Sequence, residues 1–148
     1  MAFDGNTPVG AMTIVGKTDG LNMLYGREDA CVLWDIRIAD AYKHNGIGQK
    51  LLDMGVSNAK KDGYQQMIIE CQNNNVPACK FYQKQGAVLS KIDMYAYYLE
   101  PEVRNEIQFI WYLDIYTNSN LSVCLIRICK KHPMTFYGHR VSSFFHLS

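Results

Sequence analysis

The residues from Lys43 to Gln49 have the types and spacing of a phosphate-binding turn. They lie between an apolar run, 31–39, and an amphipathic run that begins at Gly46. A turn that leads from a strand into a helix presents successive backbone N–H groups to an anion, and the positive end of the helix dipole adds to the attraction. The spacing is neither a Walker A loop nor a dinucleotide-binding turn, since Leu51 stands where a third glycine would be. A plain strand-to-helix turn is the alternative reading.

A second set of polar residues follows another apolar run. Glu70 ends that run and opens the pattern Glu70-x-x-x-x-Asn75-x-x-Ala78-x-Lys80-Phe81-Tyr82-x-x-x-Gly86. Together with the glycine turn, this pattern resembles the GNAT superfamily of acetyltransferases. The resemblance implies that the turn binds the pyrophosphate of coenzyme A, that Asn75 contacts the pantetheine arm, and that Tyr82 lies beside the thiol.

Within that superfamily, the chain most specifically resembles the streptothricin acetyltransferases, and this resemblance covers residues 3 to 115. It rests on four segments, 35–39, 69–75, 78–82 and 105–112. The last segment contains Phe109-x-Trp111-Tyr112, which is more discriminating than the glycine turn. The resemblance implies an α/β GNAT fold, with a mixed and mostly antiparallel sheet flanked by helices, and acetyl-CoA as co-substrate.

Acetyl transfer from a thioester to an amine needs one group that takes a proton from the amine and another that assists the leaving sulfur. Glu70 is the first candidate for the base, and its spacing from Asn75 and Tyr82 resembles that in ribosomal-protein N-acetyltransferases. Glu70 could instead cap the following helix or pair with a lysine. Asp35 is the alternative base, or a carboxylate that attracts the acceptor amine.

Tyr82 is the candidate general acid for the leaving thiolate. An aromatic residue on a short helix is more often part of the core, and that alternative stays open here. Asn75 stands where a helix N-cap belongs, with Pro77 in the first turn. Capping and coenzyme binding are compatible roles for Asn75.

Backbone groups complete the expected coenzyme site. By the resemblance, main-chain atoms of three strand residues bind the pantetheine amides: Ile36, Arg37 and Ile38. The N–H groups of six loop residues hold the pyrophosphate: His44, Asn45, Gly46, Ile47, Gly48 and Gln49. Lys43 replaces the family's usual Arg or Gln, so it supplies charge without the bidentate geometry of a guanidinium.

The composition argues against other classes of partner. A net charge of +1 over 148 residues gives no electrostatic case for nucleic acid. The five cysteines are odd in number and form no C-x-x-C pair, which predicts reduced thiols, a cytoplasmic protein and no metal site. The longest late apolar run, 121–129, is interrupted by Arg127 and is too short to span a membrane.

Charge divides the chain near Asp114. Four of the 15 Lys and Arg residues and none of the 14 acidic residues lie in 116–148, which gives that segment a charge of +4 and leaves −3 on 1–115. We therefore predict an acetyl-CoA-binding domain over 1–115 and a basic, aromatic tail over 116–148. The tail is a candidate for homodimer formation.

Hydrophobic periodicity predicts two helices and six strands. The helices are expected at 46–61 and from Asn75 to Gly86. The strands are expected at 8–15, 31–39, 67–71, 88–91, 94–99 and 107–115. Against the family fold, the chain is expected to start at the second strand, without the first strand and the first two helices.

The resemblance implies an N-acetyltransferase that moves an acetyl group from acetyl-CoA to a primary amine, either of streptothricin or of a similar small polyamine. Two alternatives remain. The chain could be a coenzyme-binding or oligomerising remnant with impaired catalysis, or a GNAT enzyme that acetylates a protein amine.

Overall fold

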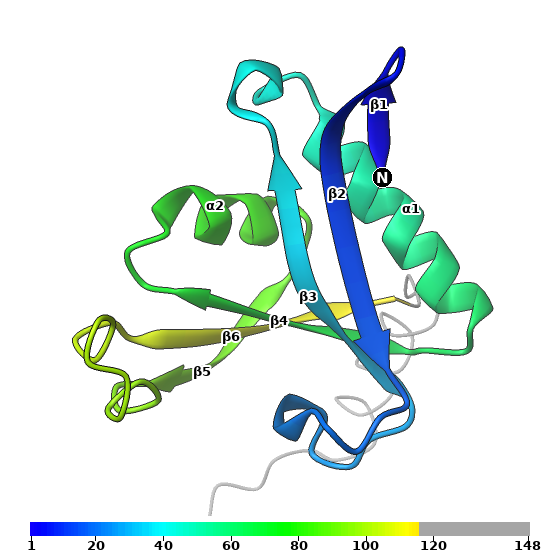
Figure 1. The fold of residues 1–148 in the computed structure, drawn as a ribbon. Helices are drawn as coiled ribbons and strands as arrows, with labels where there is room; N and C mark the ends of the chain where they lie inside the picture. Colours follow the sequence, from blue (N-terminus) through cyan, green and yellow to red (C-terminus); the bar gives the residue numbers. More distant parts are fainter. Residues whose placement is uncertain (116–148) are drawn as a thin grey trace, which may run out of the picture. The chain divides into compact units, whose positions relative to one another are not determined.

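A computed structural model describes residues 1–115, and the predicted tail over 116–148 lies outside them. The described residues form one six-stranded sheet with two α-helices and two short 3-10 turns (Figure 1). In chain order the elements are β1 (Ala2–Asp4), β2 (Thr7–Gly16), η1 (Asn22–Leu24), β3 (Ala30–Ile38), η2 (Asp40–Tyr42), α1 (Ile47–Lys61), β4 (Gln66–Gln72), α2 (Val76–Lys84), β5 (Val88–Asp93) and β6 (Gln108–Asp114).

The sheet has the strand order β1-β2-β3-β4-β6-β5. Only β3 and β4 pair in parallel, and every other neighbouring pair is antiparallel. The parallel pair needs a crossover, which α1 supplies between the two strands. This arrangement confirms the predicted α/β fold with a mixed, mostly antiparallel sheet.

The two central strands separate part-way along their length. β3 and β4 pair over four residues each, from Ala30–Gln66 to Leu33–Ile69. Beyond Leu33, β3 stays paired only with β2, while β4 stays paired only with β6 (Figure 1). The register between β2 and β3 shifts at this point, so that Trp34 is an extra residue on β3. A bulge of this kind bends a strand and increases its twist.

Each face of the sheet has its own apolar cluster. The larger cluster lies on the helix face, where Leu52 and Ala59 of α1 and Tyr82 of α2 pack against alternate residues of β3, β4 and β6. The smaller cluster lies on the opposite face, where Leu24 of η1 packs against Val32 and neighbouring residues. Both α-helices therefore lie against one face of the sheet.

The predicted strand at 94–99 is wrong. This segment is a series of turns that continues to residue 105. The Asp93 carboxylate accepts the Tyr95 N–H at 3.0 Å, and the Tyr98 N–H then reaches the Tyr95 carbonyl at 3.1 Å. An aspartate that bonds the backbone two residues later favours a turn over a strand. The remaining predicted strands and both helices are confirmed, with small differences at their ends.

Gly55 tests the packing of α1 on the sheet. A Cβ at this position would lie 2.9 Å from Ile14 Cδ1 and would overlap the Met12 side chain, both on β2. Overpacking of this kind typically costs about 1–3 kcal/mol, more than the ~1 kcal/mol that a helix gains from Gly→Ala. We expect Gly55→Ala to lower the free energy of unfolding by about 1 kcal/mol in urea denaturation.

Gly48→Ala is the matched control, because a Cβ there would make only ordinary van der Waals contacts, with the Phe81 ring at 3.8 Å and Ile38 Cγ1 at 3.9 Å. We expect this variant to be as stable as the parent or slightly more stable. Equal unfolding midpoints for Gly55→Ala and the parent chain would contradict the packing described.

Candidate functional site

Within residues 1–115, the separation of β3 and β4 leaves backbone groups of β3 without a sheet partner on the β4 side. Ala39 N–H donates to the Val9 carbonyl at 2.9 Å, which fixes the alternation of the antiparallel β2–β3 ladder. By that alternation the main-chain groups of Arg37 point toward β2, while those of Ile36 and Ile38 point toward the separated side. Of the three residues predicted to bind the pantetheine amides, Ile36 and Ile38 therefore have main-chain groups available to an extended ligand. Those of Arg37 are used by the β2–β3 ladder.

The glycine turn presents a row of N–H groups at the start of α1. Gly46 has φ +77° and His44 has φ +65°, both in the left-handed region. The first helical bond runs from Lys50 N–H to the Gly46 carbonyl at 3.1 Å, and no acceptor within residues 1–115 receives the preceding N–H groups, from residue 44 to residue 49. Lys43 Nζ lies 2.6 Å from Asp40 Oδ1, so its charge is already paired in an exposed ion pair.

Glu70 lies on the face of the sheet opposite the helices. Its neighbour Ile68 packs in the smaller cluster and Ile69 in the larger one, so alternation puts Glu70 with Ile68. The Glu70 carboxylate is half-buried and accepts a hydrogen bond from the Tyr97 hydroxyl. Neither sequence alternative, helix cap or lysine partner, is what the structure shows.

Asp35 lies on the same face as Glu70, on the other separated strand. Thr13 is its cross-strand partner, and Ile36, the next residue along, packs toward the helix face. Arg37 donates to both Asp35 carboxylate oxygens, at 2.8 and 2.9 Å. Asp35 is thus a paired carboxylate, which suits it less to the role of a free base than Glu70.

Tyr82 extends from α2 into the larger cluster and is 6% exposed. Burial raises the pKa of its phenol to about 12, and the nearby Cys71, Cys79 and Asp35 act in the same direction. The phenol therefore keeps its proton at neutral pH, as a hydrogen-bond donor to a leaving sulfur must. No acceptor within residues 1–115 bonds its hydroxyl.

Asn75 is the N-cap of α2. Its Oδ1 accepts the Ala78 N–H at 3.2 Å, and Pro77 occupies the first turn. The cap uses the side-chain oxygen and leaves Nδ2 as a donor on an exposed side chain. Asn75 can therefore cap α2 through Oδ1 and still donate from Nδ2 to a ligand, so the two predicted roles are compatible.

The chain matches the family model described as Acetyltransferase (GNAT) family over residues 1–87. The chain belongs to the GNAT acetyltransferase family. It is 31% identical over 99 residues to streptothricin acetyltransferase of Escherichia coli, a match that covers 67% of this chain and 55% of that protein. It is 33% identical over 78 residues to streptothricin acetyltransferase A of Bacillus subtilis, which covers 53% of this chain and 44% of the relative.

Structural similarity agrees with the family. A Bacillus anthracis structure described as a streptothricin acetyltransferase in complex with acetyl coenzyme A superposes with a TM-score of 0.64 and 28% identity, covering 76% of this chain and 58% of that one. The chain spans about half the length of the curated relatives that it matches.

Tyr97 is a residue of the candidate site that the sequence analysis did not identify. It stands in the segment predicted to be a strand, where it would have been one of several alternating aromatic residues. The signal that could have found it is the Asp93 turn, since a turn after β5 folds the following tyrosines back toward β4.

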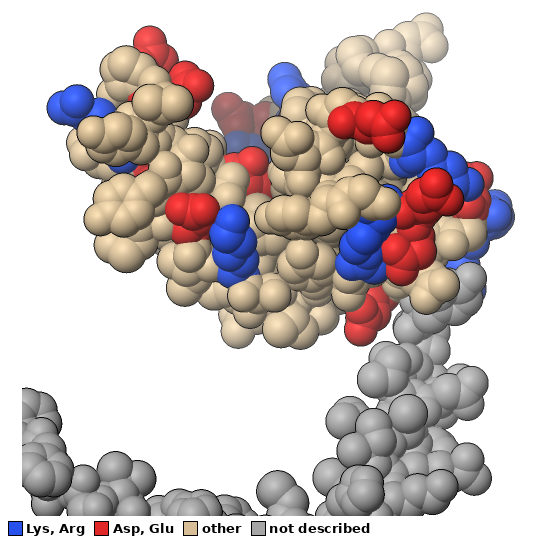
Figure 2. Space-filling model, turned by 90° about the horizontal axis from the view of Figure 1, so that it is seen from below, with Lys and Arg blue, Asp and Glu red and all other residues tan. Residues whose placement is uncertain are grey.

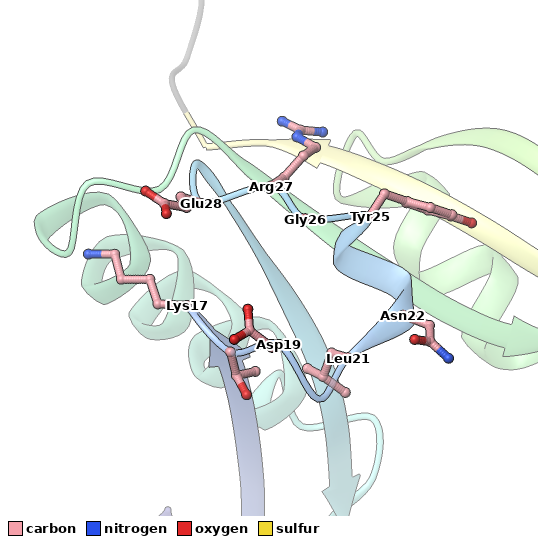
Figure 3. Close-up of a pocket in the computed structure, with 9 residues that line it drawn as sticks. Lys17, Asp19, Leu21, Asn22, Tyr25, Gly26, Arg27 and Glu28 are labelled. Atoms are coloured by element: carbon pink, nitrogen blue, oxygen red, sulfur yellow. The ribbon is translucent and has the colours of Figure 1, made fainter.

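A separate pocket of about 460 Å³ lies in the β2–β3 connection (Figure 3). Its Arg27 is bound to Asp29 through two bonds of 2.9 Å and to Gln66 at 2.7 Å, and Lys17 Nζ donates to the Asp62 carbonyl at 3.2 Å. These cations hold the loop in place. The pocket adjoins the start of β3, at the other end of the strand from the glycine turn, and contains no predicted site residue.

Three further features bear on ligands and partners. Within residues 1–115, no group of His, Cys, Asp and Glu side chains could hold a metal ion, and no helix is long and apolar enough to cross a membrane. The face seen in Figure 2 carries Lys and Arg side chains next to Asp and Glu side chains, without a broad area of one sign.

Buried thiol and phenol groups predict a loss of stability at alkaline pH. Burial raises the pKa of the Cys31 thiol to about 11, and that of the Cys71 thiol to about 12, from ordinary values near 9. Between these values the unfolded chain has lost protons that the native chain keeps, so the free energy of unfolding falls as pH rises. We expect urea midpoints to be steady below about pH 9 and to fall progressively up to about pH 12, with Tyr82 adding to the fall above pH 10.

Cys31→Ala is the informative variant for this prediction. It removes one of the raised groups, so its unfolding free energy should fall less steeply between pH 9 and pH 11 than that of the parent, whatever its stability at neutral pH. Parallel curves for the two proteins would contradict the assignment.

Proposed function

We propose that this chain binds acetyl-CoA between the separated strands and transfers the acetyl group to a primary amine of a small cationic acceptor. The observation that carries the proposal is the separation of β3 and β4. Within residues 1–115 it leaves the backbone of Ile36 and Ile38 unpaired on that side, shortly before a turn whose six N–H groups have no acceptor among the same residues. An extended amide chain that ends in a pyrophosphate has the complementary groups in the same order. The bound acetyl coenzyme A of the Bacillus anthracis relative supports this ligand.

The proposed coenzyme site uses residues on the helix face and at the edge of β3. The main-chain groups of Ile36 and Ile38 bind the pantetheine amides as an added strand would. The N–H groups from His44 to Gln49 hold the pyrophosphate, with the α1 dipole behind them. Lys43 moves from Asp40 to a phosphate oxygen, an exchange of one exposed ion pair for another. Asn75 donates its free Nδ2 to a pantetheine carbonyl.

The proposed reaction begins with the ammonium form of the acceptor. Glu70 takes one proton from the ammonium, which yields a neutral amine and a carboxylic acid. The amine nitrogen forms a bond to the thioester carbonyl carbon, and the carbon–sulfur bond breaks. The Tyr82 hydroxyl stabilises the leaving thiolate by a hydrogen bond, and the second proton of the nitrogen completes the coenzyme thiol. The products are an amide and free coenzyme A.

The proposed acceptor is streptothricin, through the amine of its β-lysine chain, or a similar polyamine. The names of the two curated relatives support this substrate class. So does the opposite face itself, where the carboxylates of Asp35 and Glu70 lie on the two strands that separate. A cationic acceptor approaching Glu70 would therefore also meet Asp35, whose partner Arg37 is largely exposed.

A second candidate function is a coenzyme-binding module without efficient transfer. It is favoured by the thin cover of the opposite face, where η1 supplies the packing within residues 1–115 and Trp34 is 59% exposed. An acceptor site with few walls would bind the coenzyme normally and the amine weakly.

The acceptor assay separates these functions. Thiol release from acetyl-CoA is measured with streptothricin, with spermidine, with a peptide amine and without acceptor. We expect turnover with streptothricin and much less with the others. Acetyl-CoA binding by calorimetry without turnover on any amine would instead establish the second candidate, and turnover on the peptide alone would point to a protein substrate.

Glu70→Gln tests the proposed base. The amide cannot take the proton, so we expect kcat/KM for the amine to fall by about 10²–10⁴-fold, with acetyl-CoA affinity unchanged. Asp35→Asn is the matched control for the other carboxylate, and it should chiefly raise KM for the acceptor. Retained activity with an unchanged pH profile in Glu70→Gln would exclude Glu70 as the base.

Asn75→Asp separates capping from coenzyme binding. Aspartate caps a helix as well as asparagine does, so the free energy of unfolding should change little, whereas Asn75→Ala should lose ~1 kcal/mol. Aspartate has no amide N–H to donate and adds a negative charge, so we expect Asn75→Asp to raise KM for acetyl-CoA severalfold. An unchanged KM would restrict Asn75 to its capping role.

A further inference from the structure

Tyr97 makes a hydrogen bond to the proposed base, Glu70, but has no role in the reaction proposed above. It lies in the series of turns between β5 and β6, and its hydroxyl donates to Glu70 Oε1. Gln108 and Glu106 also lie near this hydroxyl and influence its titration. A phenol from a loop is thus inserted beside a β4 carboxylate, on the face where the acceptor amine is proposed to bind.

The loop that carries Tyr97 is fixed at both ends. At its start, the Asp93 side chain holds the Tyr95 N–H. At its end, Ile107 exchanges two hydrogen bonds with Asn73, one from each backbone N–H, at 2.8 and 2.9 Å. Asn74 Nδ2 adds a bond of 2.8 Å to Glu106 Oε1. The segment after β4, which follows Glu70 directly, therefore anchors the loop that returns Tyr97 to Glu70.

We propose that Tyr97 is a positioning residue for Glu70, holding one carboxylate oxygen so that the other faces the acceptor amine. This inference rests on the proposed function of Glu70 as the base. No donor within residues 1–115 bonds Glu70 Oε2, so the hydrogen bond at Oε1 restricts the rotation of the carboxylate and leaves Oε2 for the proton of the ammonium. A base held in one orientation loses less freedom when the substrate binds.

Burial and nearby carboxylates keep the Tyr97 phenol protonated, so that it acts as a hydrogen-bond donor. Burial and the bond to Glu70 raise the pKa of the Tyr97 phenol, and Glu106 acts in the same direction. Within residues 1–115, Glu70 also acts electrostatically on the Cys71 thiol, which is buried on the other side of β4. The neutral phenol donates its proton to the hydrogen bond with Glu70 Oε1.

Tyr97→Phe is the decisive variant, because it keeps the ring and removes the hydroxyl. We expect kcat for acetyl transfer to fall about tenfold, the change that corresponds to one lost charge-assisted hydrogen bond, with KM for acetyl-CoA unchanged. A donor stabilises the charged carboxylate over the acid, so its removal should move the acidic limb of the kcat/KM profile to higher pH, by roughly half a unit. Tyr98→Phe, on an exposed neighbouring side chain, is the control and should change neither quantity.

A stability cycle tests the contact independently of turnover. Urea midpoints are measured for Tyr97→Phe, Glu70→Gln and the double variant, and we expect the effects of the two changes to be non-additive. An active parent enzyme whose kcat and pH profile survive Tyr97→Phe would overturn the inference, as would additive midpoints. If the parent transfers acetyl to no amine, the proposed function fails, and non-additive midpoints would still establish that Tyr97 holds Glu70.

Discussion

The parallel pairing of β3 and β4 ends after four residues, and the proposed site depends on that limit. Backbone N–H and C=O groups that are buried without a partner cost about 1–3 kcal/mol each, so strands that separate must offer their edges to water or to a ligand. The extra residue at Trp34 bends β3 at the point of separation, while β2 and β6 hold the two strands on their outer sides. The strand pairing itself therefore keeps β3 and β4 apart, and no ligand is required to separate them. A ligand with its own amide groups restores the missing pairing, which is the physical reason that an extended pantetheine arm suits this edge.

The two faces of the sheet divide the remaining tasks. α1 and α2 pack on one face, and their first turns carry the N–H row and Asn75. The opposite face carries Glu70 and Asp35, where a cationic acceptor can approach without crossing the helices. Tyr82 links the two, because its ring belongs to the helix-face cluster while Asp35, on the other face, is close enough to influence its titration. In the proposed reaction the thioester and the amine would therefore meet from opposite sides of the sheet, and the coenzyme and the acceptor would use separate sets of contacts.

Much of this arrangement was predictable from local signals. Gly46 and Gly86 mark helix boundaries through left-handed φ values, and the Asn75–Pro77 pair predicts the start of α2, because each of these signals acts within one or two turns of chain. The segment 94–99 was mispredicted because its alternating aromatic residues imitate a strand, while the deciding interaction is a single Asp93 side chain. Tyr97 could not be paired with Glu70 from the sequence, because their contact spans 27 positions and depends on where β6 returns. The division between Ile36, Arg37 and Ile38 required the register of the β2–β3 ladder.

Electrostatics adds a last constraint on the coenzyme site. Its Lys43 is already engaged with Asp40. This is a largely exposed ion pair, for which typical stabilisation is about 0–1 kcal/mol, so Lys43 can exchange partners at little cost. Lys43 can therefore add little net attraction for a pyrophosphate, since the new contact replaces the old one. The N–H groups of the glycine turn differ, because they have no partner within residues 1–115 to give up. The backbone of the turn, more than its lysine, should then supply the attraction for phosphate, and that explains how Lys43 can stand where the family usually has Arg or Gln.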